Sequence, residues 1–161
     1  MALVVHKYGG SSVADAEKIK NVARRIANVR EKGIDEVAVV SAMGNWSDEL
    51  IDLAHSVSFN PHPRDLDLLL STGELVSSTL LTMALADLGQ EAVSLTGSQA
   101  GIHTDTSYGR ALINRVDTAR MEASSVSPFW IFLESGVCVM VVCGLVTNLA
   151  NCLVDGLLRR K

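Results

Sequence analysis

Residues 3–12, LVVHKYGGSS, decide the fold, because a short apolar run leads directly into a glycine pair. The first three of them are apolar and mostly β-branched, which is typical of a buried strand. After the glycine pair, apolar residues recur at steps of three and four, which predicts one face of a helix; they are Ile19, Val22, Ile26 and Val29. Gly33 stands where a left-handed C-terminal cap is expected. The chain therefore begins with a strand, a loop and a helix.

The alternation of strands and helices continues downstream. Residues 36–41 (EVAVVS) predict a second strand that is too apolar for a half-exposed sheet, as expected where both faces are covered. A turn at residues 42–48 leads into a helix from about Glu49 to Val57, and residues 60–63 (NPHP) end it. The second strand is therefore also followed by a polar turn and a helix.

The next part of the chain predicts more helix and a third strand. A helical stretch at residues 66–70 is interrupted at residues 71–74 (STGE), and a further helix runs from Glu74 to Leu88, where Gly89 stops it. Residues 92–95 then predict a strand. Sustained alternation of this kind predicts a three-layer α/β/α domain with a mainly parallel sheet.

Glycine-containing polar loops follow each predicted strand. They are Gly9–Gly10, the turn around Gly44, and residues 97–101 (GSQAG). Ligands of parallel α/β sheets gather at the carboxyl ends of the strands. A strand feeding a glycine pair and then a helix can hold phosphate through close backbone amides, and Lys7 would add a positive charge. A simple turn remains the alternative on local grounds, since the spacing is not that of a Walker A loop.

Composition narrows the class of protein. The chain has 161 residues, about one domain, and 48% of them are hydrophobic. The 14 Lys and Arg against 18 Asp and Glu give a charge of -4, which argues against a nucleic-acid partner or an anionic membrane surface. The N-terminus lacks the basic and small-residue features of a secretory signal, so we expect a cytoplasmic protein. We interpret the three cysteines as buried small hydrophobic residues; they are Cys138, Cys143 and Cys152. The four histidines show no metal-ligand spacing; they are His6, His55, His62 and His103.

Four segments in order resemble the aspartate kinases of the amino acid kinase family. They are residues 7–13 (KYGGSSV), 39–45 (VVSAMGN), 70–74 (LSTGE) and 95–101 (LTGSQAG). The resemblance runs from about Leu3 to about Arg120. It implies an enzyme that uses ATP and Mg²⁺ to phosphorylate the side-chain carboxylate of aspartate, the first step towards lysine, threonine and methionine.

The resemblance also implies roles for individual residues. Lys7, Tyr8, Gly9 and Gly10, with Ser11 and Ser12 beside them, would contact ATP, and Lys7 would be the catalytic cation. Ser41 would lie in the cleft between nucleotide and substrate. Ser47 keeps the hydroxyl of a family threonine that contacts aspartate, while Trp46 replaces another threonine and, pointing outward, would be tolerated. Glu74 would bind the substrate, with a charge at a helix N-terminus as the alternative.

The implied reaction needs few special groups. The aspartate nucleophile is already ionised near neutral pH, since an unperturbed Asp pKa is about 3.9, so no general base is required. Positioning and charge neutralisation, with Mg²⁺ bridging phosphate oxygens, carry the catalysis. The absence of a Ser/His/Asp or Cys/His set in the sequence is therefore expected.

After Arg120 the resemblance weakens. Residues 137–144 (VCVMVVCG) could form the next core strand, but residues 148–161 contain no Gly-Arg-Gly-Gly-Ser-Asp segment. We therefore expect a partial amino acid kinase domain over residues 1–161, family-like over 1–120 and with a divergent apolar tail over 121–161, and no regulatory domain. Such a chain would be weakly active or inactive alone. A homo-oligomer or another chain could complete the domain.

Other readings stay open. The chain could be a different amino acid kinase, acting on glutamate, acetylglutamate, carbamate or a nucleoside monophosphate. It could also be a non-catalytic fragment that binds a partner subunit through the exposed side of the helix at residues 75–88 or through an open sheet edge. Residues 129–158 are largely apolar, but Glu134, Asn148, Asn151 and Asp155 interrupt them, which argues against a membrane span.

Overall fold

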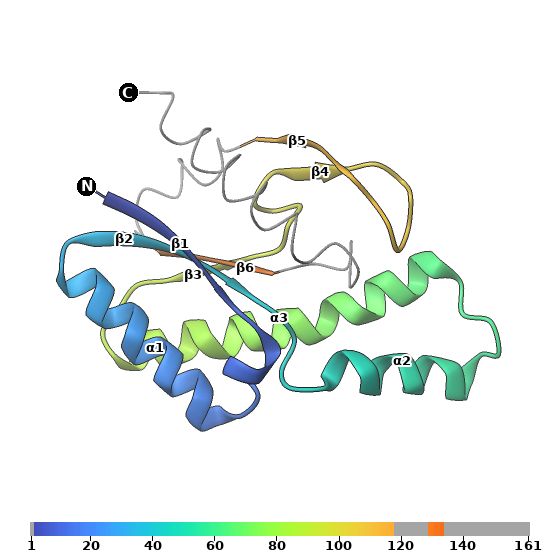
Figure 1. Cartoon of the computed structure of the whole chain (residues 1–161), viewed down its shortest axis with the longest axis horizontal. Coiled ribbons are helices and arrows are strands. Elements are labelled where there is room, and N and C mark those ends of the chain that lie inside the picture. Colours follow the sequence, from blue (N-terminus) through green and yellow to red (C-terminus); the bar gives the residue numbers. More distant parts are fainter. Residues whose placement is uncertain (1, 118–128, 134–161) are drawn as a thin grey trace.

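A four-stranded parallel sheet organises the molecule (Figure 1). The computed structural model describes residues 2–117 and 129–133. The strand order is β1-β2-β6-β3, and the bounds are β1 Ala2–Tyr8, β2 Ile34–Val40, β3 Val93–Leu95 and β6 Phe129–Leu133. The predicted α/β class with a mainly parallel sheet is confirmed.

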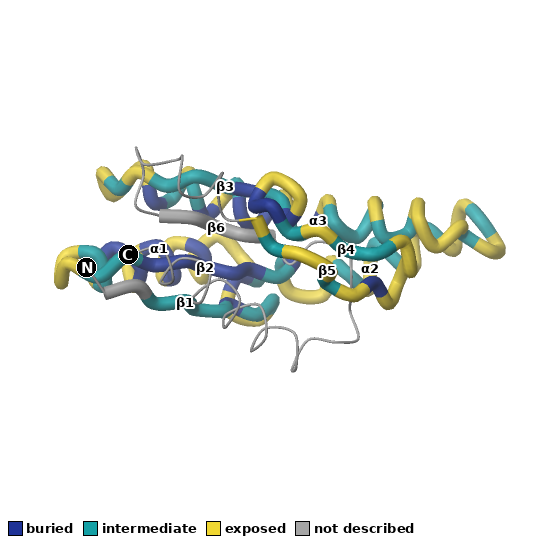
Figure 2. Tube along the Cα trace, turned by 90° about the horizontal axis from the view of Figure 1, so that it is seen from above, coloured by how far each residue is buried: buried dark blue, intermediate teal, exposed yellow. Residues whose placement is uncertain are grey.

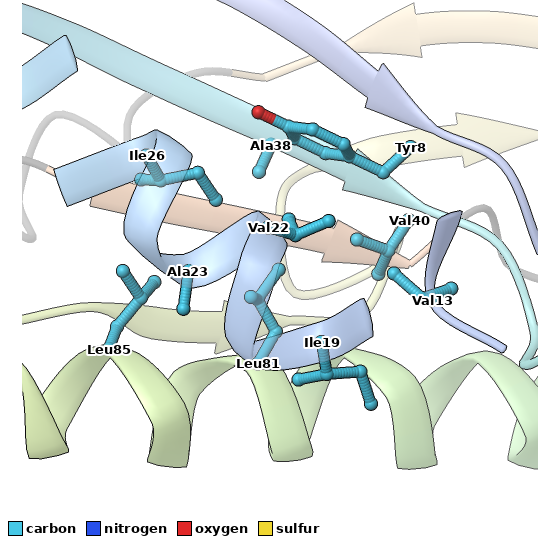
Figure 3. Packing of buried hydrophobic residues seen from close by; sticks show 10 residues of the cluster. All are labelled: Tyr8, Val13, Ile19, Val22, Ala23, Ile26, Ala38, Val40, Leu81 and Leu85. Carbon is cyan, nitrogen blue, oxygen red and sulfur yellow. The ribbon is translucent and has the colours of Figure 1, made fainter. Parts of the chain in front are cut away.

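Helices cover one face of this sheet. Helices α1 (Ala16–Glu31) and α3 (Pro63–Asp87) lie against it, and α2 (Trp46–Val57) packs on the part of α3 that projects beyond the sheet (Figures 1 and 2). The main core lies between sheet and helices (Figure 3), and its buried residues are Tyr8, Val13, Ile19, Val22, Ala23, Ile26, Ala38, Val40, Leu81 and Leu85.

A β-hairpin covers the opposite face. Strands β4 (Ile102–Thr104) and β5 (Ile113–Val116) pair antiparallel. Ile102 and Val116 pack with a second cluster made of Val37, Val39, Leu95 and Ala100. Within the described part of the chain this face carries the hairpin, and the second helical layer of the predicted three-layer arrangement is not among those residues. The sequence analysis did not predict the hairpin.

Helix α1 forms as its sequence predicts. Asp15 caps its N-terminus by accepting a hydrogen bond of 2.9 Å from the Lys18 amide, and Ile19, Val22 and Ile26 face the core. The chain leaves the helix through Gly33, whose φ of 73° is the left-handed value that a C-terminal cap requires.

Helix α3 corrects one prediction. The interruption expected at residues 71–74 does not exist, because the helix is continuous from Pro63 to Asp87. The hydroxyls of Ser71 and Thr72 donate to the carbonyls three residues earlier, at 2.7 Å and 2.6 Å, so these side chains are satisfied inside the helix. Glu74 therefore lies within a helix and not at the start of one.

Among the described helices, α3 alone is long and apolar enough to cross a membrane. That criterion concerns length and composition only, and the core helix of a soluble protein meets it equally well. The fully buried Leu81 and Leu85 lie in the main core, which is typical of such a core helix. The stretch at 129–158 begins with β6, and its remainder, with the predicted strand at 137–144 and the cysteines, lies outside the described residues.

Candidate active site

The carboxyl ends of β1 and β2 lie side by side at one edge of the sheet. The strands are parallel, and their last paired residues are Tyr8 and Val40. The pairing continues one step further, since the Ser41 amide donates to the Tyr8 carbonyl at 3.1 Å. The loops that begin at Gly9 and Ser41 therefore start as neighbours, as predicted for polar loops of a parallel sheet.

The two loops are in direct contact at Gly10. The Gly44 amide donates to the Gly10 carbonyl at 3.0 Å. A Cβ atom on Gly10 would lie 2.8 Å from the Ala42 carbonyl oxygen and 2.9 Å from that of Gly44, both backbone atoms. Only glycine fits here, because any side chain would push the loops apart.

The middle of α3 closes the same edge from below. A Cβ on Gly73 would lie 3.1 Å from the Ala42 Cβ and 3.3 Å from Cδ1 of Leu50. One turn later, the Ser77 hydroxyl donates to the Ser41 carbonyl at 2.7 Å. In Figure 1 the end of β2 accordingly lies beside the central part of α3. The first loop, the second loop and α3 form one contiguous packing unit.

Glu74 belongs to this unit because it follows Gly73 directly. The residue is half-buried, and its Oε2 atom is buried. Its position on the helix flank next to the second loop fits a carboxylate that meets a ligand at the sheet edge. The helix-start alternative for Glu74 is wrong, since α3 begins eleven residues earlier at Pro63.

Lys7 and Tyr8 lie on opposite faces of β1, as strand alternation requires. Lys7 is half-buried and pairs with Val39, whereas Tyr8 is buried on the helix side. The Tyr8 hydroxyl donates to Oε1 of Glu36 at 2.9 Å. Burial raises the pKa of this hydroxyl above its ordinary value, and the charge and hydrogen bond of Glu36 raise it further. The phenol therefore points into the core, away from the loop that follows.

The glycine pair leads into a short 3₁₀ turn, η1 (Gly10–Ser12), before α1 begins. Ser11 and Ser12 are exposed in it. We expected the following helix to offer its N-terminus to an anion, but the Asp15 carboxylate already caps α1. The first amides of a helical turn have no partner within that turn, so the amides at the start of η1 are the candidates for phosphate.

Ser47 lies in the first turn of α2 and is half-buried. The helix begins at Trp46, three residues before the predicted start. The Trp46 side chain is 39% exposed, so its bulk is accommodated at the surface. The departure from the family pattern at this position therefore does not distort the contact between the first two loops.

The third polar loop follows β3, which is parallel to β1 and β2 through β6, and so lies at the same edge. Thr96 and Gln99 hold it by reciprocal hydrogen bonds of 3.0 Å and 3.2 Å. All three polar loops predicted to follow the carboxyl ends of the strands therefore lie at the same edge of the sheet.

The hairpin beyond this loop is fastened to α3. The Gly109 amide donates to Oδ2 of Asp67 at 2.8 Å, and the ring of Tyr108 lies edge-on to that of His62, with 6.5 Å between centroids. Residues 102–116 carry a weak signal for this element, namely apolar ends around a Gly-containing turn. The signal alone does not show that the tip reaches α3.

Within residues 2–117 and 129–133, no group of three or more His, Cys, Asp or Glu side chains is arranged to hold a metal ion. The loops fit a nucleotide better than a bare cation, because close backbone approach and a neighbouring lysine are features that polyphosphate needs.

Comparison with known proteins agrees with this geometry. The model of the amino acid kinase family matches residues 2–153. An aspartokinase of Mycobacterium bovis is 50% identical over 141 residues, which cover 88% of this chain and 32% of that protein. One of Geobacillus stearothermophilus is 50% identical over 121 residues, covering 75% and 30%. The chain thus spans about a third of the length of the curated relatives it matches.

Solved structures share the fold. The crystal structure of aspartate kinase from Synechocystis has a TM-score of 0.70 at 42% identity, covering 82% of this chain and 21% of that one. E. coli aspartokinase III in complex with aspartate and ADP has a TM-score of 0.64 at 19% identity, covering 83% and 40%. With a family match over most of its length and this shared architecture, the chain belongs to the amino acid kinase family.

Proposed function

We propose that this chain forms the N-terminal part of an aspartokinase catalytic domain, which transfers the γ-phosphoryl group of ATP to the side-chain carboxylate of aspartate. The observation that carries the proposal is the convergence of the Gly9–Gly10 loop, the Ser41–Gly44 loop and the Gly73–Ser77 turn of α3 at one sheet edge. Relatives that share about half of the aligned residues are named aspartokinases.

In this proposal the first loop holds ATP. Amides at Gly9, Gly10 and Ser11 would bind phosphate oxygens, the Lys7 ammonium would neutralise charge on the transferring group, and Ser41 would line the cleft beside it. Tyr8 would act on the nucleotide site indirectly, from within the core, because its hydroxyl is buried against Glu36. Mg²⁺, when bound with the nucleotide, would offset negative charge on its phosphate groups.

The amino acid would lie between α3 and the start of α2. The Glu74 carboxylate suits the ammonium group of aspartate, and the Ser47 hydroxyl can hydrogen-bond to a substrate oxygen. Both side chains are half-buried, so they combine partial shelter from water with access from the edge. Partial desolvation strengthens such charge-assisted contacts.

The reaction then follows from positioning. A side-chain oxygen of aspartate attacks the γ-phosphorus, the bond from that phosphorus to the β–γ bridging oxygen breaks, and ADP leaves with the electron pair. The product is an acyl phosphate, aspartyl phosphate. Because the attacking carboxylate is already ionised, this chain need only orient it and offset negative charge.

The proposal extends to the cellular location, the pathway and the assembly of the protein. We propose a cytoplasmic biosynthetic enzyme leading towards lysine, threonine and methionine, working as a homo-oligomer or with another chain that completes the domain. Because the chain corresponds to about a third of its relatives, adenine binding and the remainder of the substrate site would come from segments beyond those described here.

Ligand binding by the native protein tests the ATP half of the proposal. Mg-ATP titrated calorimetrically should bind, and Lys7→Ala should weaken binding by about tenfold or more, since it removes a charge-assisted contact. Lys20→Ala is the matched control, because Lys20 is an exposed lysine of α1 that pairs with Glu17. Equal affinity of the Lys7→Ala and Lys20→Ala proteins for Mg-ATP would contradict the proposal.

The aspartate half is tested by trapping the acyl phosphate with hydroxylamine. Glu74→Gln should raise the KM for aspartate and leave the KM for ATP unchanged. Glu49→Gln, an exposed carboxylate in the first turn of α2, should change neither value. A Glu74→Gln enzyme with the wild-type KM for aspartate would remove Glu74 from the site.

A further inference from the structure

The Tyr8 side chain joins the end of β1 to the middle of β2. The ring lies on the helix face of the sheet beside Ala38, and Figure 3 shows the hydroxyl directed away from the loop that follows. Although Tyr8 pairs with Val40 in the strand register, its hydroxyl donates to Glu36, four residues earlier on β2. Ala38, between them on the same face, is small enough to leave room for the ring.

The acceptor is held as firmly as the donor. Glu36 is fully buried, and Tyr8 is only 5% exposed. Nδ1 of His6, two residues before Tyr8 on the same face, lies 2.9 Å from the same Oε1 atom, a contact that is an ion pair only when the imidazole is protonated. Arg25 of α1 is the other charged group acting on the Tyr8 hydroxyl. A buried polar cluster of this kind is costly to disturb, because a lost donor leaves a buried acceptor unsatisfied.

The main chain of Tyr8 is equally engaged. Its carbonyl accepts from the Ser41 amide, and the next residue is Gly9, the start of the phosphate loop. Two residues further on, the Gly10 carbonyl accepts from the Gly44 amide. Tyr8 is therefore the last residue of β1 fixed by both side chain and backbone before the chain turns into the loop.

We propose that Tyr8 is a positioning residue of this site: its hydrogen bond to Glu36 holds the end of β1 against β2 and thereby fixes the contact between the Gly9–Gly10 loop and the Ser41–Gly44 loop. Its effect on catalysis rests on the proposed kinase function, whereas its effect on the loops does not. Tyr8 thus acts on the nucleotide through the backbone and not by touching it with the phenol.

Amide hydrogen exchange without ligand tests the structural part. Tyr8→Phe keeps the ring and removes the donor, so the amides of Ser41 and Gly44 should exchange about tenfold faster. The amides of Ser58 and Leu66, which bond within the α2–α3 region, should be unchanged. Tyr108→Phe is the matched control, since it removes a hydroxyl from the exposed hairpin. Unchanged exchange at Ser41 and Gly44, or faster exchange everywhere, would overturn the proposal.

Variants of the acceptor give the second measurement, and they decide the matter should Tyr8→Phe fail to fold. Glu36→Gln keeps an acceptor oxygen and should leave the Ser41 and Gly44 amides within about twofold of wild type, whereas Glu36→Met removes it and should reproduce the Tyr8→Phe pattern. Equal exchange in the two Glu36 variants would refute a role for the hydrogen bond.

The effect of Tyr8 on the proposed kinase function is measured separately, through ligand binding and kinetics. In the native protein Tyr8→Phe should weaken Mg-ATP binding by about fivefold and leave the KM for aspartate unchanged, while Glu36→Gln should keep the ATP affinity of wild type. Simple loss of folded protein would lower the active fraction and leave both constants alone, which contradicts the proposal. Failure of the wild-type protein to bind Mg-ATP would refute the kinase function while the exchange result on the loops still stood.

Discussion

The two halves of α3 are equally helical but have different surroundings. In the C-terminal half, Leu81 and Leu85 are fully buried between the sheet and α1. In the N-terminal half, Leu68 is 64% exposed, and Leu53 of the adjoining α2 is 55% exposed. Figure 2 shows this change from buried to exposed along the helix. The difference teaches that one half stabilises the fold while the other extends from it.

The candidate site lies where the two halves meet. Gly73 and Ser77 contact the second loop, and Glu74 stands between them. A ligand at this boundary would have the rigid sheet on one side and the less buried α2–α3 pair on the other. Rigid elements hold a reacting group in place, and elements with few buried contacts are the ones that can move.

The largest effect is expected from the buried half. Leu81→Ala should lower the free energy of unfolding by about 3 kcal/mol, because it removes buried methyl groups and leaves a cavity in the main core. Leu68→Ala makes the same chemical change in the exposed half of α3 and should cost less than about 0.5 kcal/mol. Urea denaturation of the two variants measures the difference. Similar losses would break the comparison between the halves.

A smaller effect is expected where the loops touch. Gly10→Ala should destabilise the protein by about 2 kcal/mol, because its Cβ would press on two backbone carbonyl oxygens that cannot move independently. Gly9→Ala is the neighbouring control, since nothing lies within 4 Å of a Cβ there. Thermal unfolding of both proteins supplies the measurement, and a Gly10→Ala protein as stable as Gly9→Ala would show that the contact is not tight.

Local pattern predicted the elements whose ends are encoded nearby. The apolar face of α1, its Gly33 cap, the first two strands and the position of three polar loops at one sheet edge all follow from spacing and turn residues. The continuity of α3 did not, because Ser71, Thr72 and Gly73 disfavour a helix in isolation. Their cost is offset by hydroxyl bonds to the helix backbone and by the packing of Gly73 on Ala42, which no local window contains.

Long-range polar contacts could not be predicted from the sequence either. Glu36 reads as the polar start of a strand, yet it is fully buried and bonded to Tyr8, 28 residues away. The hairpin at residues 102–116 was missed because its strands are only three and four residues long and its tip is fixed by Asp67 on a distant helix. The roles of Lys7, Ser41, Ser47 and Glu74 stay predictions until ligand binding is measured.

Alkaline pH should give an effect of about 1 kcal/mol that originates at Tyr8. Its pKa is raised in the folded protein, so the folded state keeps the phenolic proton after the unfolded state has lost it. This contribution is fully present below about pH 10 and is lost above it, by up to about 1.4 kcal/mol per pH unit. Between pH 9 and pH 11 the free energy of unfolding should therefore fall more for wild type than for Tyr8→Phe. The Tyr108→Phe protein is the control and should lose as much as wild type. Parallel curves for all three would exclude the buried hydroxyl as the cause.

The smallest effect is expected in the exposed half of α3. Asp67→Ala removes the acceptor of the Gly109 amide and should cost about 0.5–1 kcal/mol, while freeing the hairpin tip. Asp65→Ala is the control, because Asp65 is exposed and its ion pair with Arg64 is long, at 4.0 Å, and therefore weak. Limited proteolysis near Gly109 should quicken in the first variant alone. Equal cleavage rates would show that the tip is held by other contacts.

The bond from Gly44 to Gly10 makes two segments, 34 positions apart in sequence, behave as one body. A compound that binds against either segment would also immobilise the other. The entropy cost of ordering the two segments would then be incurred only once. Two compounds held on the two sides would then favour each other, and by thermodynamic reciprocity each would raise the affinity of its neighbour by the same factor.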